Sequence, residues 1–135
     1  MTLRPVVLPP NVCGTLRLSS MPGRFGPWQA FETEARRVGL AEGKLSFRWH
    51  DLPMPNFGLP EDPSAFRRNI SRIAAALRDG DAVMLHCAAG LGRTGTAAAC
   101  VLKALGVDQA EALERVREAG SNPQNAKQSG LVGWL

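Results

Sequence analysis

The sequence lacks several features that would place it in a common class of protein. No run of apolar residues approaches the roughly 18 that a membrane span requires, so no membrane-spanning helix is expected. Its 3 cysteines are an odd number and do not fit the disulfide framework of a small secreted domain. Residues 1–10 hold a short apolar run broken by prolines, which is typical of neither a signal peptide nor a transit peptide. We therefore expect a cytoplasmic protein that does not bind membranes.

The sequence also lacks the density of lysine and arginine found in dedicated nucleic-acid-binding arms. Its net charge of +4 is a mild excess that suits phosphorylated ligands, and solvated arginines that merely keep the protein soluble would explain it as well. The pattern GxxxxGK[ST] of nucleotide-binding P-loops does not occur. We expect no nucleic-acid partner.

Length and composition predict one globular domain over residues 1–135. Hydrophobic residues make up 44% of the chain and charged residues 21%, which is ordinary for a folded protein. Strands are predicted at 3–8, 14–18, 44–50 and 82–85 from branched, alternating or continuous apolar residues. Because strands alternate with helices along the chain, we expect an α/β fold with a central, mostly parallel sheet flanked by helices.

A helix is predicted directly after a proline-rich loop at residues 52–63. Asp62 and Pro63 are typical of an N-cap and a first helical residue. Apolar residues then recur at helical spacing on one face, namely Phe66, Ile70, Ile73, Ala74 and Leu77. The other face carries four arginines that we interpret mainly as solvated surface, namely Arg67, Arg68, Arg72 and Arg78.

Alanine-rich and capped stretches predict the remaining helices. Residues 96–105 are dense in alanine, leucine and valine and predict a buried helix that ends at Gly106. Asp108 with Glu111 resembles a capping box that opens a helix running through Glu118. Two further helices are predicted, one with Pro27 in its first turn and one that is capped by Ser121 or Asn122 and has Pro123 in its first turn.

The segment from His86 to Gly95 lies between a predicted buried strand and a predicted buried helix. Its small residues allow backbone N–H groups to converge on an anion, and the positive end of the helix adds to the attraction. The same dipoles, together with Arg93, would keep a cysteine at position 87 ionised. We therefore predict Cys87 as a nucleophile at a phosphate-binding loop formed by Ala88, Ala89, Gly90, Leu91, Gly92 and Arg93.

Arg93 and Thr94, between Gly92 and Gly95, give this loop its predicted chemistry. Arg93 follows Cys87 by six positions, so a curled loop can bring its guanidinium against two phosphate oxygens. Thr94 can donate a hydrogen bond to the sulfur and help it leave when a phosphocysteine intermediate is hydrolysed.

The same segment allows two other interpretations. Gly90, Gly92 and Gly95 match the GxGxxG pattern of dinucleotide-binding proteins. In that fold an acidic residue follows about twenty positions later at the end of a second strand, whereas Glu111 and Glu114 fall inside a predicted helix. A buried structural cysteine would leave the arginine in this small, apolar segment unexplained.

Four stretches of the chain resemble motifs of the protein tyrosine phosphatase superfamily. HCAAGLGRTG at residues 86–95 is similar to its HCxxGxxR[ST]G signature, and the GLGRTG ending resembles the dual-specificity branch. PNFGLPE at 55–61 resembles the acid loop of these enzymes, and QNAKQ at 124–128 resembles the segment that positions the hydrolytic water. SSMPGRF at 19–25 resembles the kinase-associated phosphatase subgroup and its bacterial relatives.

The resemblance implies the cysteine-dependent phosphatase fold and hydrolysis of a phosphomonoester through a phosphocysteine. Cys87 would be the nucleophile, Arg93 would bind phosphate and stabilise the transition state, and Thr94 would assist the second step. Gln124 and Gln128 would position the water. It implies no metal or cofactor, an oxyanion in the loop and a phosphorylated protein or peptide as partner. His86 would tune the thiolate from behind or serve the core.

Asn56 departs from the family pattern, because it stands where these enzymes place the aspartic acid that protonates the leaving oxygen. An amide cannot donate that proton, and losing such a group typically costs about 10²–10⁴ in rate. Asp51, Glu61 and Asp62 are nearby carboxylates that could substitute, or that cap helices and face solvent. The alternative is a binding module that captures phosphorylated ligands and turns them over poorly.

A second departure is length, since residues 27–50 are shorter than the corresponding part of such relatives, which predicts a reduced N-terminal part of the sheet. The chain also has 0 tyrosines and no counterpart of the tyrosine-bearing recognition loop of the tyrosine-only enzymes. Phosphotyrosine or dual-specificity substrates are therefore expected, in a shallow pocket, and phosphoinositides or nucleotides stay open. Cys100 is expected in the core, and Cys13 has no assigned role.

Overall fold

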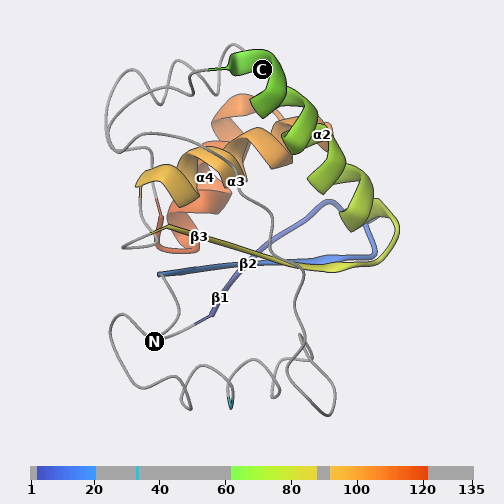
Figure 1. Ribbon diagram of the computed structural model, residues 1–135. Helices are drawn as coiled ribbons and strands as arrows, with labels where there is room; N and C mark the ends of the chain where they lie inside the picture. The colour runs from blue at the N-terminus through green and yellow to red at the C-terminus, as the bar shows by residue number, and fades with distance from the viewer. Residues whose placement is uncertain (1–2, 21–32, 34–61, 88–91, 122–135) are drawn as a thin grey trace.

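The fold is described here from a computed structural model of the chain, in residues 3–20, 33, 62–87 and 92–121 (Figure 1). These residues form, in chain order, the strands and helices β1 (Arg4–Val6), β2 (Thr15–Ser20), α2 (Pro63–Arg78), β3 (Ala82–Cys87), α3 (Gly92–Ala104) and α4 (Gln109–Glu118). The arrangement is α/β, as the alternation of strands and helices predicted.

The strands form a small mixed sheet in the order β1-β2-β3. β1 runs antiparallel to β2, and β2 runs parallel to β3 with Leu18 opposite Leu85 and Ser20 opposite Cys87. A parallel pair needs a crossover connection, and α2 lies between these two strands in the chain. The three described helices all lie on one face of the sheet (Figure 1).

The alternation of residues along each strand decides which side chains face the helices. Leu16 and Leu18 of β2 are buried against them, and Val83 and Leu85 of β3 pack against the same core. Every second residue of a strand points to the same face, so Cys87 belongs to the helix-covered face as well. The sheet therefore delivers Cys87 to the carboxyl end of β3, beneath the helices.

Helix α2 begins and packs as its sequence predicts. Asp62 caps it, since its Oδ1 accepts a hydrogen bond from the Ala65 N–H at 3.0 Å, and Pro63 is its first residue. Its buried residues are Phe66, Ile70, Ala74 and Leu77. The arginines of the opposite face are exposed, as expected for solvated side chains.

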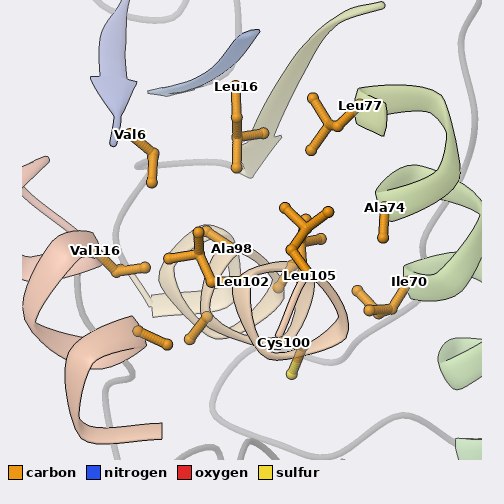
Figure 2. Packing of buried hydrophobic residues seen from close by; sticks show 14 of the residues in the cluster. Val6, Leu16, Ile70, Ala74, Leu77, Ala98, Cys100, Leu102, Leu105 and Val116 are labelled. Carbon is orange, nitrogen blue, oxygen red and sulfur yellow. The ribbon is translucent and has the colours of Figure 1, made fainter. Parts of the chain in front are cut away.

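Helix α3 is the centre of the core. It packs against both α2 and α4 and lies beneath the strands, as the side chains of Leu102, Leu105 and Ala98 show (Figure 2). Cys100 is 0% exposed and points away from the strands, so its prediction as a core residue is confirmed (Figure 2).

The start of α3 differs from the prediction. The helix begins at Gly92, not at Thr96, because burial stabilises a first turn that its own composition disfavours. Each glycine costs roughly 1 kcal/mol relative to alanine in a helix. Here Gly92, Thr94 and Gly95 are all buried, and the Thr96 hydroxyl donates to the Gly92 carbonyl at 2.8 Å.

Helix α4 runs from Gln109 to Glu118 and is capped by Asp108, which accepts a hydrogen bond from the Ala110 N–H at 3.2 Å. Ala112 and Val116 face the core, as predicted. The predicted helix after Pro27, the predicted strand at 44–50 and the predicted helix after Ser121 or Asn122 lie outside the described residues.

Candidate active site at the end of strand β3

The predicted nucleophile stands at the end of a strand, shortly before a helix begins. Cys87 is the last residue of β3, and α3 begins five positions later at Gly92. The side chain of Cys87 is half-buried. The β-strand thus fixes the backbone of this residue, and its side chain lies where the amino end of α3 begins.

Thr94 donates a hydrogen bond to the sulfur of Cys87. Its Oγ1 donates a hydrogen bond to Cys87 Sγ at 3.0 Å, and the side chain is only 2% exposed. A hydroxyl bonded to sulfur in a water-poor setting favours the charged form of that sulfur. This is the contact expected of a group that stabilises a thiolate, first as nucleophile and later as leaving group.

The amino end of α3 adds a second favourable field. The first backbone N–H groups of a helix have no intrahelical acceptor and carry partial positive charge. Because Thr94 belongs to the first turn of α3 and contacts the sulfur, Cys87 lies at this positive end. Arg93, the second residue of the helix, is half-buried and carries a full positive charge at this same end of α3.

His86 lies on the other face of the sheet from Cys87. In β3 it alternates with the cysteine, and it pairs in register with Ser19 of β2, which is 0% exposed. Burial lowers the pKa of the His86 imidazole from its ordinary value of 6.5, so the neutral ring is favoured. A neutral ring behind the nucleophile fits both roles that the sequence left open for it.

Arg4 is part of this site although sequence reasoning did not select it. It lies on β1, and its guanidinium interacts electrostatically with Cys87 while its Nη1 donates to the Ala119 carbonyl at 3.0 Å. The sequence carried no signal for this contact, because the two partners of Arg4 lie more than eighty positions along the chain from it. A search for cations near the first predicted strand would have found the residue but not its role.

Several predicted site residues lie outside the described residues, namely Asn56, Ala88, Ala89, Gly90, Leu91, Gln124 and Gln128. Of the predicted site, the described residues bring together Cys87, Thr94 and the start of α3. Within the described ranges, no three side chains of metal-binding types gather in one place.

Comparison with known proteins adds family evidence to this geometry. A model of the tyrosine phosphatase family matches residues 49–114, a stretch that includes β3, α3 and the segment between them. Over these residues the chain is similar to the tyrosine phosphatase family. The resemblance that the sequence motifs predicted is thereby confirmed.

A solved structure agrees with this similarity at the level of the fold. The chain resembles a kinase-associated phosphatase whose catalytic-site cysteine is replaced by serine. The two share 20% sequence identity, and the match covers 98% of this chain and 92% of the other with a TM-score of 0.76. At this identity the likeness shows a common fold, which is that of the kinase-associated phosphatase.

The fold also bears on the dinucleotide-binding alternative. That alternative needs an acidic residue at the end of a second strand, about twenty positions after the glycines. Glu111 and Glu114 lie in helix α4, as predicted, where each forms an ion pair with an arginine of the same helix. These two acidic residues therefore do not stand at the end of a strand, as the dinucleotide-binding alternative requires.

Proposed function

We propose that this chain hydrolyses phosphate monoesters through a phosphocysteine intermediate on Cys87, as a single phosphatase-like domain over residues 1–135. The observation that carries the proposal is the hydrogen bond from the buried Thr94 hydroxyl to Cys87 Sγ at 3.0 Å. Similarity to the tyrosine phosphatase family and the position of Cys87 between strand and helix support it.

In the first step the Cys87 sulfur attacks phosphorus and the ester oxygen leaves with its electron pair. Arg93 and the backbone N–H groups of residues 88–93 balance the charge on the transferring phosphoryl group. The leaving oxygen normally receives a proton from an aspartic acid. Asn56 cannot supply it, so esters with poor leaving groups are expected to react slowly.

In the second step water attacks the phosphocysteine and the sulfur–phosphorus bond breaks. The departing sulfur takes the electron pair, and the Thr94 hydroxyl stabilises it by the hydrogen bond already described. Gln124 and Gln128 are proposed to orient the water, which loses its proton to solvent or to a nearby base.

Hydrolysis of para-nitrophenyl phosphate tests the nucleophile, because this leaving group scarcely needs protonation. Cys87→Ser is expected to abolish the activity. Cys13→Ser is the matched control, since Cys13 is exposed and precedes β2 at the opposite end of the sheet, and it is expected to retain the activity. Equal rates for Cys87→Ser and the unmodified protein would refute the proposal.

A phosphate-binding module with little turnover is the second candidate, and Asn56 is the observation that favours it. Asn56→Asp separates the two. In an enzyme that lacks its acid, the substitution is expected to raise the rate on alkyl phosphates by about 10²–10⁴ while leaving para-nitrophenyl phosphate nearly unchanged. A binding module would show tungstate binding by calorimetry and no gain in turnover on either ester.

Phosphoproteins are the proposed substrates, in keeping with the family and with a neighbour that is named a kinase-associated phosphatase. Phosphotyrosine is favoured by its better leaving group, and a shallow dual-specificity pocket is proposed because the chain has 0 tyrosines for a recognition loop. A cytoplasmic setting suits a thiolate that must stay reduced.

A further inference from the structure

We infer that Arg4 is a second cation that stabilises the Cys87 thiolate, and that the carboxyl end of helix α4 holds its guanidinium in place. The inference rests on the proposed function, since it assigns to Arg4 an effect on the nucleophile. Arg4 does not touch the substrate in this scheme and acts through the sulfur.

Strand register places Arg4 at the same end and face of the sheet as Cys87. Arg4 lies opposite Leu18 in the antiparallel pair, and Leu18 lies opposite Leu85 in the parallel pair. Residues that oppose each other across strands share a face, so Arg4 is on the face of Leu18, Leu85 and Cys87. The side chain of Val6, two positions further along β1, is 6% exposed on this face.

The Arg4 guanidinium is bound by hydrogen-bond acceptors in the residues that follow α4. Its Nη1 donates to the Ala119 carbonyl oxygen and to the Ser121 hydroxyl, both at 3.0 Å. Ser121 is itself only 2% exposed. The residue between them is a glycine with φ of +85°, and a Cβ added to Gly120 would stand 2.9 Å from Arg4 Nη1. Both the conformation and the space at Gly120 therefore suit the arginine.

The groups that bind the Arg4 guanidinium leave its positive charge available to act on the Cys87 sulfur. A carbonyl at the end of a helix carries partial negative charge, which attracts the cation without neutralising it. Burial lowers the pKa of the Arg4 guanidinium, and the negative charge of Cys87 acts in the opposite direction. An attraction between two charges is mutual, so the cation that the thiolate favours also favours the thiolate.

Other charged groups around Cys87 can be separated from Arg4 by position. Arg93 begins α3 beside the loop, whereas Lys103 lies in the last turn of that helix. His86 and Arg17 alternate with Cys87 and Leu18 and belong to the opposite face of the sheet. The arginines of α2 lie on its exposed side. Among the described residues, Arg4 and Arg93 are therefore the cations positioned to act on the sulfur.

The test measures the alkylation rate of Cys87 by iodoacetamide as a function of pH, in a Cys13→Ser background that removes the exposed cysteine. Arg4→Gln is expected to shift the inflection to higher pH and, at pH values below the inflection, to slow alkylation by roughly threefold to tenfold. Arg4→Lys is expected to retain most of the rate, because it keeps the charge.

Arg115→Gln is the matched structural control. Arg115 also ties α4 to the chain next to β1, since its Nη1 donates to the Val7 carbonyl at 3.2 Å, but Val7 lies beyond the opposite end of β1 from Arg4. The pH profile of Cys87 alkylation in Arg115→Gln is expected to match that of the unmodified chain. Equal profiles for Arg4→Gln and Arg115→Gln would overturn the inference and leave the proposed function standing.

A thiol in the unmodified chain that titrates near the free-cysteine value of about 8.5 would instead overturn the proposed function. If Arg4→Gln does not fold, Gly120→Ala provides the same test, since the added Cβ would displace the guanidinium. An unshifted inflection in a folded Gly120→Ala protein would also overturn the inference.

Discussion

The Thr94 hydroxyl and the Cys87 sulfur form a hydrogen bond in surroundings that hold little water. Thr94 is 2% exposed, so its bond is made in a medium of lower effective dielectric than the solvent. A bond of this kind is stronger when the sulfur is charged. In the proposed mechanism, its effect should be greatest in hydrolysis of the phosphocysteine, which is the step that restores the thiolate.

Removing that hydroxyl is therefore expected to slow the second step selectively. Thr94→Ala should reduce the rate of phosphocysteine hydrolysis about 10- to 100-fold, because a hydrogen bond to a charged group contributes roughly 1.5–3 kcal/mol. Rapid mixing with para-nitrophenyl phosphate should reveal a burst of nitrophenolate followed by slow turnover. Thr94→Ser keeps the hydroxyl and should behave like the unmodified chain, and a burst of equal size in both variants would contradict this role.

The cysteines show how strongly burial separates the behaviour of one residue type. Burial raises the pKa of the Cys100 thiol to about 12, and the nearby Lys103 lowers it only in part. Cys100 therefore stays protonated at neutral pH and acts as a packing residue. Cys87 differs because its sulfur accepts a hydrogen bond at the positive end of a helix.

At the scale of the elements, the turn from α2 into the sheet leaves no room for a side chain at Gly14. Its N–H donates to the Leu77 carbonyl at 2.8 Å, and the next N–H, of Thr15, donates to Asp81 at 3.1 Å. A Cβ on Gly14 would stand 2.6 Å from both the Leu77 and Asp81 carbonyl oxygens. These contacts are with backbone, which cannot move aside as the end of a side chain can.

Gly14→Ala should consequently destabilise the fold by about 1–3 kcal/mol or more, the usual effect of overpacking. Urea unfolding followed by circular dichroism measures the loss. Cys13→Ala is the adjacent control, because Cys13 is exposed and its substitution should change stability by less than about 0.5 kcal/mol. Similar losses for the two variants would show that the close approach at Gly14 is relieved by backbone movement.

The elements that could be predicted from the sequence are those whose signals are local. The start of α2 is predicted by Asp62 with Pro63, and the start of α4 is predicted by Asp108. Both N-caps are observed. The start of α3 was wrong by four residues, because glycine propensity acts locally whereas the burial that overrides it is tertiary.

In the candidate site, too, contacts between residues close in the sequence could be predicted, and contacts between distant residues could not. Cys87 and Thr94 are seven positions apart, and a motif could place them together before their hydrogen bond was seen. Arg4 and Ser121 are separated by 117 positions, so no pattern along the chain could pair them. The roles of Asn56, Gln124 and Gln128 remain predictions, because they depend on the family motif alone.

At the scale of the whole molecule, the described residues have a core between one face of the sheet and helices α2, α3 and α4, with α3 in the middle (Figure 2). His86 belongs to the other face, where it is half-buried and where its pKa is lowered by burial. Below its ordinary pKa of 6.5, the unfolded chain takes up a proton on this ring more readily than the folded protein does. Acidification therefore removes stability through His86.

This coupling predicts a difference between the unmodified chain and His86→Gln. As the pH falls from above 6.5 through the lowered folded-state pKa, the unmodified chain should lose more stability than the variant, and above 6.5 the two profiles should run parallel. Urea unfolding at a series of pH values measures both profiles, and the subtraction removes the common contribution of the carboxylates. Parallel profiles throughout the acidic range would contradict the prediction.

The first turn of helix α3 lies at the candidate site, and the rest of the helix contributes the consecutive buried residues Ala97–Leu102 to the core. Random mutagenesis across its thirteen residues would thus select for expression and for turnover at once, and most inactive clones would be insoluble proteins rather than altered enzymes. Engineers who wish to change substrate preference should therefore leave this helix constant.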